Sequence, residues 1–249
     1  MLYAIYQEIL YRPLVNGLAL LTGLVPGHDI GLAIILLTLV VRIVLFPLTH
    51  RSLLTQRKMK ELEPHINRIR SETKERRELQ SQKIMELYRL HGVKPLLGCL
   101  TLFIQLPVLV ALYHVFWKGL LFDDPSIYYS FISPPEFIQT NFLGLLDLTS
   151  PSWLLAFFAG FSQFFQMKLA QPLLPPRGTS FKEEMSRALA IQSLYIFPFL
   201  IFFISFRFPA ALALYWTASN IFATLHEALV RRSAGPVYDD PRGKDQSNH

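Results

Sequence analysis

Apolar and polar residues fall in long alternating blocks along the chain, and five of the apolar blocks are long enough to cross a bilayer as helices. The first block, at residues 30–48, reads IGLAIILLTLVVRIVLFPL. As a helix it extends about 28 Å, close to the roughly 30 Å of the hydrocarbon core. The others lie at residues 95–120, 153–169, 188–206 and 208–229. This pattern predicts an all-α membrane protein with five transmembrane helices.

The segments outside these blocks are more polar. In residues 1–29 apolar side chains recur at helical spacing, but their runs are too short and too polar to span a membrane. We expect an N-terminal extracytoplasmic interfacial helix there, with a shallow extra span as the alternative. The remaining segments are a predicted helical hairpin at 49–94, loops at 121–152 and 170–187, and a tail at 230–249.

The predicted hairpin at residues 49–94 has a sharply different composition, with twelve Lys and Arg and six Glu. Pro64 is expected to kink its first arm, and residues 84–88 offer apolar side chains for a facing arm. Four apolar residues of the first arm are spaced three and four apart, as in a coiled-coil seam: Met59, Leu62, Ile66 and Ile69. The spacing predicts an antiparallel helical hairpin that projects into water.

The tip of this hairpin, at residues 71–78, is strongly charged. Lys74, Arg76 and Arg77 are candidate docking residues for a targeting or ribosomal partner, and a merely solvated face is the open alternative. No aromatic stacking pattern accompanies the basic residues, so we expect no sequence-specific binding of nucleic acid.

The distribution of basic residues predicts the orientation in the membrane. Of the 24 Lys and Arg, most lie in or beside the hairpin, the loop at 170–187 and the tail. Cytoplasmic segments carry an excess of Lys and Arg. The hairpin, that loop and the C-terminus are therefore predicted in the cytoplasm, and the N-terminus outside.

The sequence carries no recognisable enzyme signature. His226 and Glu227 begin like a zinc-protease motif, but Val230 stands where the second histidine is required. Neither a phosphate-binding glycine loop nor a nucleophile elbow is found. Cys99, the one cysteine, excludes an internal disulfide and argues against a cysteine-based zinc site. We therefore expect no catalytic residues, no metal and no cofactor.

Arg42 is the one charged residue within the first apolar block. An arginine at the centre of a transmembrane helix costs about 3 kcal/mol on insertion scales, so it normally faces a polar cavity unless it snorkels to the surface. Both interpretations remain open for Arg42 alone. Further polar or amphipathic residues of the spans are expected to share a hydrated recess with it: Thr38, Gln105, Gln163, Tyr215, Trp216, Ser219 and Asn220. Ser162, Ser193 and Thr101 are interpreted instead as interhelical hydrogen-bonding residues.

Four sequence segments carry a family resemblance. They are LFPLT at the end of the first block, KMKELEPHI in the hairpin, KPLLGCLTLFIQLPVLVALYHVF in the second block and FPAALALYWTASNIF in the fifth. In this order they resemble the YidC/Oxa family of membrane protein insertases, over about residues 29–232. Lys94, Thr101 and Ala211 depart from the family pattern, but none of them is a predicted groove position.

The resemblance implies a fold of five core spans with a cytoplasmic hairpin, surrounding a groove that opens to the cytoplasm and to lipid. Arg42 would be the groove arginine with Thr38 as its hydroxyl neighbour, and Gln105 the groove glutamine of the second span. Tyr215 and Trp216 would form an aromatic slide for the client helix.

The implied activity is the insertion and folding of nascent membrane proteins in the bacterial plasma (inner) membrane, without nucleotide hydrolysis. The implied partners are the ribosome, the Sec translocon, the signal-recognition-particle receptor and membrane lipid. The alternative is a small-solute transporter or channel, although the spans contain no inverted repeat that would support it.

Overall fold

The computed structural model of the chain describes residues 2–73, 76–94, 107–116, 125–133, 137–170, 185, 188 and 191–233. The chain divides into two compact units. The first comprises residues 1–45 and 105–227, and the second comprises residues 46–104 and 228–249. The described residues are mostly helical, as the sequence predicts, and each unit is presented separately below.

The first unit begins with a continuous helical segment made of α1 (Leu2–Tyr6), the π-helical turn η1 (Gln7–Tyr11) and α2 (Arg12–Leu24). Its further elements are η2 (Pro26–His28), α3 (Ile30–Val44), the helix Pro107–Phe116, η3 (Pro125–Ile127), β1 (Asn141–Phe142), β2 (Leu146–Asp147), α8 (Trp153–Ala170), η4 (Gln192–Ile196), α10 (Phe197–Arg207) and most of α11 (Ala210–Ser233). β1 and β2 form a two-stranded antiparallel sheet, with Asn141 opposite Asp147.

The turn between α2 and α3 has a clear local cause. Pro26 opens it, and Gly27 has φ 66°, a left-handed conformation that glycine adopts without steric cost. Asp29 then caps α3, because its Oδ1 accepts hydrogen bonds from the backbone N–H groups of Gly31 at 2.8 Å and Leu32 at 3.2 Å. The chain therefore reverses direction and starts α3 at Ile30.

The predicted apolar block at residues 30–48 is divided at Leu45, where α3 ends and α4 (Phe46–Glu61) begins. Pro47 explains the break, since it has no N–H to donate to Ile43 and its ring would clash with the preceding helical turn. Among the described residues, no helix on its own combines the length and apolar character needed to cross a membrane. The bent pair α3 and α4 meets both criteria only when its two helices are taken together.

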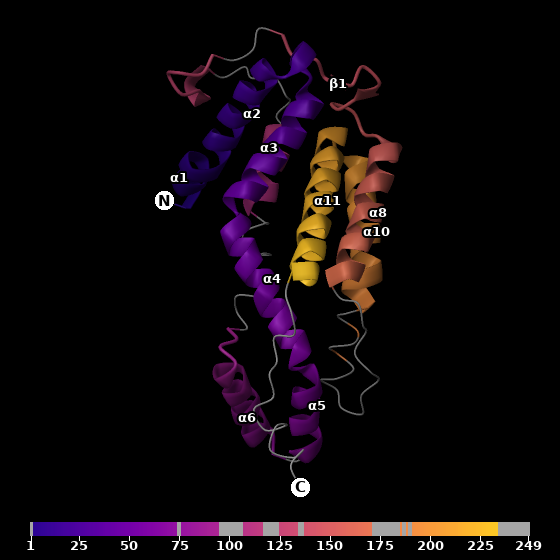
Figure 1. Cartoon of the computed structure of the whole chain (residues 1–249). Helices are drawn as coiled ribbons and strands as arrows, with labels where there is room; N and C mark the ends of the chain where they lie inside the picture. The colour runs from indigo at the N-terminus through magenta and orange to yellow at the C-terminus, as the bar shows by residue number, and fades with distance from the viewer. Residues whose placement is uncertain are drawn as a thin grey trace. The chain divides into compact units, whose positions relative to one another are not determined.

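Large apolar side chains from several elements form the core of the first unit. Leu18 of α2, Ile30 and Ile34 of α3, Leu148 after β2 and Ile201 of α10 are almost fully buried. Figure 1 shows α11 between α3 on one side and the pair α8 and α10 on the other. This places α11 at the centre of the unit.

α8 and α10 pack closely at Gly160. A Cβ atom at this position would lie 3.0 Å from the carbonyl oxygen of Pro198 and 3.1 Å from Cβ of Phe202. Small residues allow helix backbones to approach in this way. Any larger residue would press against the backbone of α10, so glycine at this position favours the close contact of the two helices.

The second unit contains α4, α5 (Glu63–Glu72), α6 (Arg77–Leu90) and the end of α11. Leu62, Ile66 and Val93 form a small buried cluster. The half-buried side chains of Met59, Ile84, Leu87 and Tyr88 pack against it. The first arm is broken at Leu62, just before Pro64. The number of spans, the domain boundaries and the cytoplasmic location of this unit stay predictions.

Candidate functional site

The guanidinium of Arg42 connects α3 to α11. Its Nε donates a hydrogen bond to Oγ of Ser219 at 3.1 Å, and its Nη2 donates to the same oxygen. Arg42 is half-buried and Ser219 is almost fully buried. No carboxylate pairs with Arg42 in the part of the chain that the structure describes. A half-buried cation is thus held by a neutral hydroxyl.

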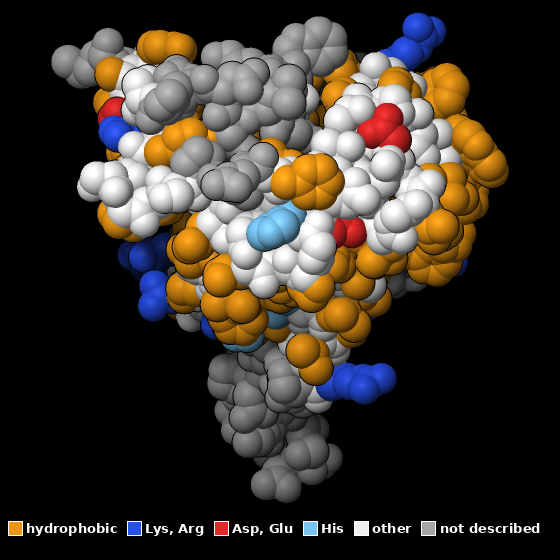
Figure 2. Space-filling model, turned by 90° about the horizontal axis from the view of Figure 1, so that it is seen from above, with side chains coloured by type: hydrophobic (Ala, Val, Ile, Leu, Met, Phe, Trp, Pro, Cys, Tyr) orange, Lys and Arg blue, Asp and Glu red, His pale blue; other side chains and the backbone are white. Residues whose placement is uncertain are grey.

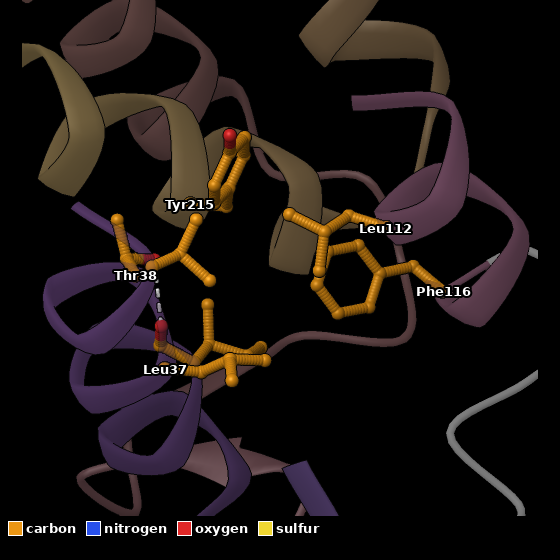
Figure 3. Close-up of a pocket in the computed structure, with 7 residues that line it drawn as sticks. Leu37, Thr38, Leu112, Phe116 and Tyr215 are labelled. Carbon is orange, nitrogen blue, oxygen red and sulfur yellow. Dashed lines mark hydrogen bonds between the residues drawn. The ribbon is translucent and has the colours of Figure 1, made fainter. Parts of the chain in front are cut away.

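Thr38 and Tyr215 lie one helical turn before Arg42 and Ser219, respectively, and line the same small pocket (Figure 3). The pocket has a volume of about 10 Å³, which is room for about one water molecule. Leu37, Leu112 and Phe116 contribute apolar side chains to its lining. The Thr38 hydroxyl donates to the carbonyl oxygen of Ile34 at 2.7 Å, within its own helix. The seam between α3 and α11 is therefore apolar at Thr38 and polar at Arg42.

Asn220 links α11 to its other neighbour, α8. Its Nδ2 donates to Oγ of Ser162 at 3.2 Å. This confirms the interpretation of Ser162 as an interhelical hydrogen-bonding residue. Gln163, the next residue of α8, is buried and donates to Oε1 of Gln166 at 3.3 Å. Ser219 and Asn220, which are adjacent in α11, thus form hydrogen bonds with two different helices, α3 and α8.

The remaining predicted site residues are Trp216, Gln105 and the three basic residues of the hairpin tip. Trp216 is half-buried and packs against the core of the first unit. Gln105 and Lys74 lie outside the described residues. Arg76 is exposed just before α6, and Arg77 begins that helix. The structure therefore brings Arg42 and Ser219 into direct contact, and Thr38 and Tyr215 around one pocket.

One segment, residues 137–150, binds the starts of both seam helices. The N–H of Ile30 donates to the carbonyl oxygen of Gln139 at 3.0 Å, and Oδ2 of Asp29 accepts from the N–H of Leu143 at 2.7 Å. At α11, the N–H groups of Ala210 and Ala211 donate to the carbonyl oxygens of Ser150 at 3.0 Å and Leu148 at 3.1 Å. The beginnings of α3 and α11 are therefore held together by this segment, which carries β1 in Figure 1.

The sequence interpretation missed this attachment. Asp29 offered a signal, because an aspartate immediately before an apolar helical block is a typical N-cap. It also missed Asn16, a buried residue of α2 whose Nδ2 donates to the carbonyl oxygen of Ile127 at 2.9 Å. Oδ1 of Asn16 accepts from the N–H of Tyr129 at 2.8 Å. α2 is thereby attached to η3 and to the loop after it, and no pattern of side chains points to these backbone partners.

Comparisons with known proteins identify the family. The model of a family described as 60Kd inner membrane protein matches residues 21–236. The chain belongs to this family. The resemblance to the YidC/Oxa insertases is thereby confirmed, because relatives named YidC match most of the chain.

Two of these relatives are named membrane protein insertase YidC. The one from Oceanobacillus iheyensis is 33% identical over 207 residues, which cover 81% of this chain and 74% of the relative. The one from Fusobacterium nucleatum is 30% identical over 204 residues, with coverage of 82% and 87%. A crystal structure of an active YidC insertase with its first transmembrane domain resolved matches with a TM-score of 0.57 and 25% identity. The match covers 92% of this chain and 47% of that one, so this chain spans about half the length of the solved chain.

An exposed apolar surface fits membership of an inner membrane protein family. Phe157, Phe161 and Phe165 of α8 are each about half exposed and lie one helical turn apart. Their rings contact in sequence, with centroid distances of 5.6 Å and 4.8 Å. Phe199 and Phe203 extend the surface on α10. Figure 2 shows hydrophobic side chains along the rim on the side of these helices.

Proposed function

We propose that this protein inserts nascent membrane proteins into the bacterial inner membrane along the seam between α3 and α11. The observation that carries the proposal is the cation of Arg42, which is half-buried and bound to a neutral hydroxyl. The relatives named membrane protein insertase support the same activity. The seam would act as a client groove open to the cytoplasm and to lipid, and would also assist folding.

The chemistry of the seam suits a client with an acidic translocated segment. A carboxylate can accept two parallel hydrogen bonds from a guanidinium, and such charge-assisted bonds are roughly twice as strong as neutral ones. Arg42 would therefore attract an acidic residue into a region where an unpaired charge is costly. Burial of the client's own apolar span in lipid would then drive its release, without nucleotide hydrolysis.

The proposal includes the finer topology. Five spans would place the N-terminus outside and the second unit in the cytoplasm, where Arg76, together with Lys74 and Arg77, would meet the ribosome, the Sec translocon or the signal-recognition-particle receptor. The exposed phenylalanine surface of α8 and α10 would contact lipid.

Substitution of Arg42 tests the proposal. We expect Arg42→Ala to slow insertion of a single-span client with an acidic tail about tenfold in proteoliposomes, because the tail loses its cationic partner. Arg42→Lys should retain most of the rate, since it keeps the charge. Equal rates for wild type and Arg42→Ala would contradict this role of the charge.

Photocrosslinking tests the path of the client. Val41 lines the pocket in the seam, whereas the neighbouring Val40 is exposed, so the two positions form a matched pair on α3. A probe at Val41 should crosslink to ribosome-bound client chains above a threshold length, and more strongly than a probe at Val40. Failure of both probes at every chain length would favour the transporter alternative.

A further inference from the structure

Ser219 has a special position relative to Arg42. Two N–H groups of the guanidinium share the single Oγ of this residue, although the two residues lie 177 positions apart in the sequence. No other hydrogen-bond partner of the guanidinium is found within the described ranges. The location of the charge therefore depends on one hydroxyl of the opposite helix.

Arg42 could reach other surroundings without that hydroxyl. It lies in the last turn of α3, and the next residues, Ile43 and Val44, are largely exposed. An arginine side chain is long enough to carry its charge away from apolar surroundings towards water. A bond that holds the guanidinium between the helices is thus needed to keep it in the seam.

The direction of Ser219 is itself fixed by its neighbours. Asn220, the next residue, donates to Ser162 of α8, which restrains the rotation of α11 about its axis. The start of α11 is bound through Ala210 and Ala211 to the segment at 137–150. Ser219 is therefore presented to α3 by a helix that is restrained at its start and on its opposite side.

We propose that Ser219 is a positioning residue that holds the guanidinium of Arg42 in the seam until an acidic group of the client replaces the hydroxyl. A carboxylate can take both N–H groups with separate oxygens, whereas the hydroxyl must share one oxygen between them. The exchange therefore favours an acidic client over a neutral one. This inference rests on the proposed insertase function and assigns the preference for acidic clients to one hydrogen bond.

The test compares two clients that differ only in charge. Both carry the same apolar span, and the translocated tail contains either three Asp or three Asn residues. Insertion rates into proteoliposomes are measured for wild type, Ser219→Ala, Ser219→Thr and Thr217→Ala. Thr217 is the matched control, because its hydroxyl donates to the carbonyl oxygen of Ala213 in its own helix at 2.8 Å.

We expect Ser219→Ala to slow the Asp client three- to tenfold and to leave the Asn client within twofold of wild type. Ser219→Thr, which keeps a hydroxyl, should restore most of the preference, and Thr217→Ala should change neither rate. In an Arg42→Ala background, Ser219→Ala should have no further effect on the ratio of the two rates, because the group that it positions is already absent.

Two results would overturn the proposal. One is an unchanged Asp-to-Asn rate ratio in Ser219→Ala, and the other is an equal loss for both clients, which would assign Ser219 a purely structural role. Failure of wild-type protein to insert either client would instead contradict the proposed function. The ratio of the Asp-client rate to the Asn-client rate thus distinguishes failure of the Ser219 proposal from failure of the proposed insertase function.

Discussion

The attachment of α3 to the segment at 137–150 depends on Asp29. The contacts of this side chain allow the loss of unfolding free energy on its removal to be worked out. Asp29 is buried and accepts three backbone hydrogen bonds, from Gly31 and Leu32 of α3 and from Leu143 of the loop. Loss of a helix N-cap costs about 1 kcal/mol. An unpaired buried N–H of Leu143 adds about 1 to 3 kcal/mol. Asp29→Ala should therefore destabilise the protein by about 2 to 4 kcal/mol.

The assay is unfolding of the purified protein in detergent, followed by circular dichroism. For a protein of this size, each kcal/mol corresponds to about 2 to 4 °C in melting temperature, so Asp29→Ala should lower it by about 4 to 16 °C. Asp29→Asn keeps an acceptor oxygen and should lose less. Hydrogen exchange at Leu143 should accelerate in Asp29→Ala, because its N–H no longer has an acceptor.

Asp147 provides the matched control. It lies in β2 and accepts hydrogen bonds from the N–H and hydroxyl of Thr149 and from the hydroxyl of Ser150, but it is exposed. Water can replace these bonds, so Asp147→Ala should shift the melting temperature by much less. A shift in Asp29→Ala no larger than that in Asp147→Ala would refute the assignment of Asp29 as the anchor of α3.

The glycines give two further predictions, each read from melting temperature. A Cβ at Gly31 would overlap the ring of Phe142, so Gly31→Ala should lower the free energy of unfolding by about 1 to 3 kcal/mol. Adding Phe142→Ala to the same chain should relieve that clash, and additive losses from the two substitutions would contradict the clash as the cause. Gly160→Ala should cost a similar amount, because the carbonyl oxygen of Pro198 cannot rotate away from the added methyl group. Gly23 of α2 is the control for both, since a Cβ added there would meet nothing within 4 Å and alanine should stabilise the helix by up to about 1 kcal/mol. Equal effects at Gly160 and Gly23 would argue against the close approach of α8 and α10.

Part of this organisation could be predicted from the sequence because helical periodicity assigns residues to faces. Leu62 and Ile66, which the spacing places in the seam of the second unit, are buried there beside Ile84 and Leu87. The family could be recognised because its motifs are contiguous strings of residues. Ser162 was correctly interpreted as an interhelical residue, since a serine within an apolar helix needs a hydrogen-bond acceptor or donor nearby.

Other features were not predicted, for physical reasons. Periodicity places Arg42 on a face of α3 but does not identify which of several distant polar residues meets it, and Ser219 was only one of them. The division at Leu45 was concealed because hydropathy stays high across Pro47, although proline carried the signal. The attachment of Ile30, Ala210 and Ala211 uses backbone atoms, which side-chain patterns do not encode.

The contacts that join α3 to α11 differ in strength along the seam between the two helices. At the helix starts, Ile30 and Ala210 are bound through backbone hydrogen bonds to a common segment, and Asp29 adds a side-chain bond to the same segment. One turn before Arg42, apolar side chains around Thr38 and Tyr215 leave space for little more than one water molecule. At Arg42, the helices are joined through the Ser219 hydroxyl, which a carboxylate can replace. The seam should therefore separate first at Arg42, while its start remains closed, so that a client's acidic residue meets the cation before any wider opening is needed.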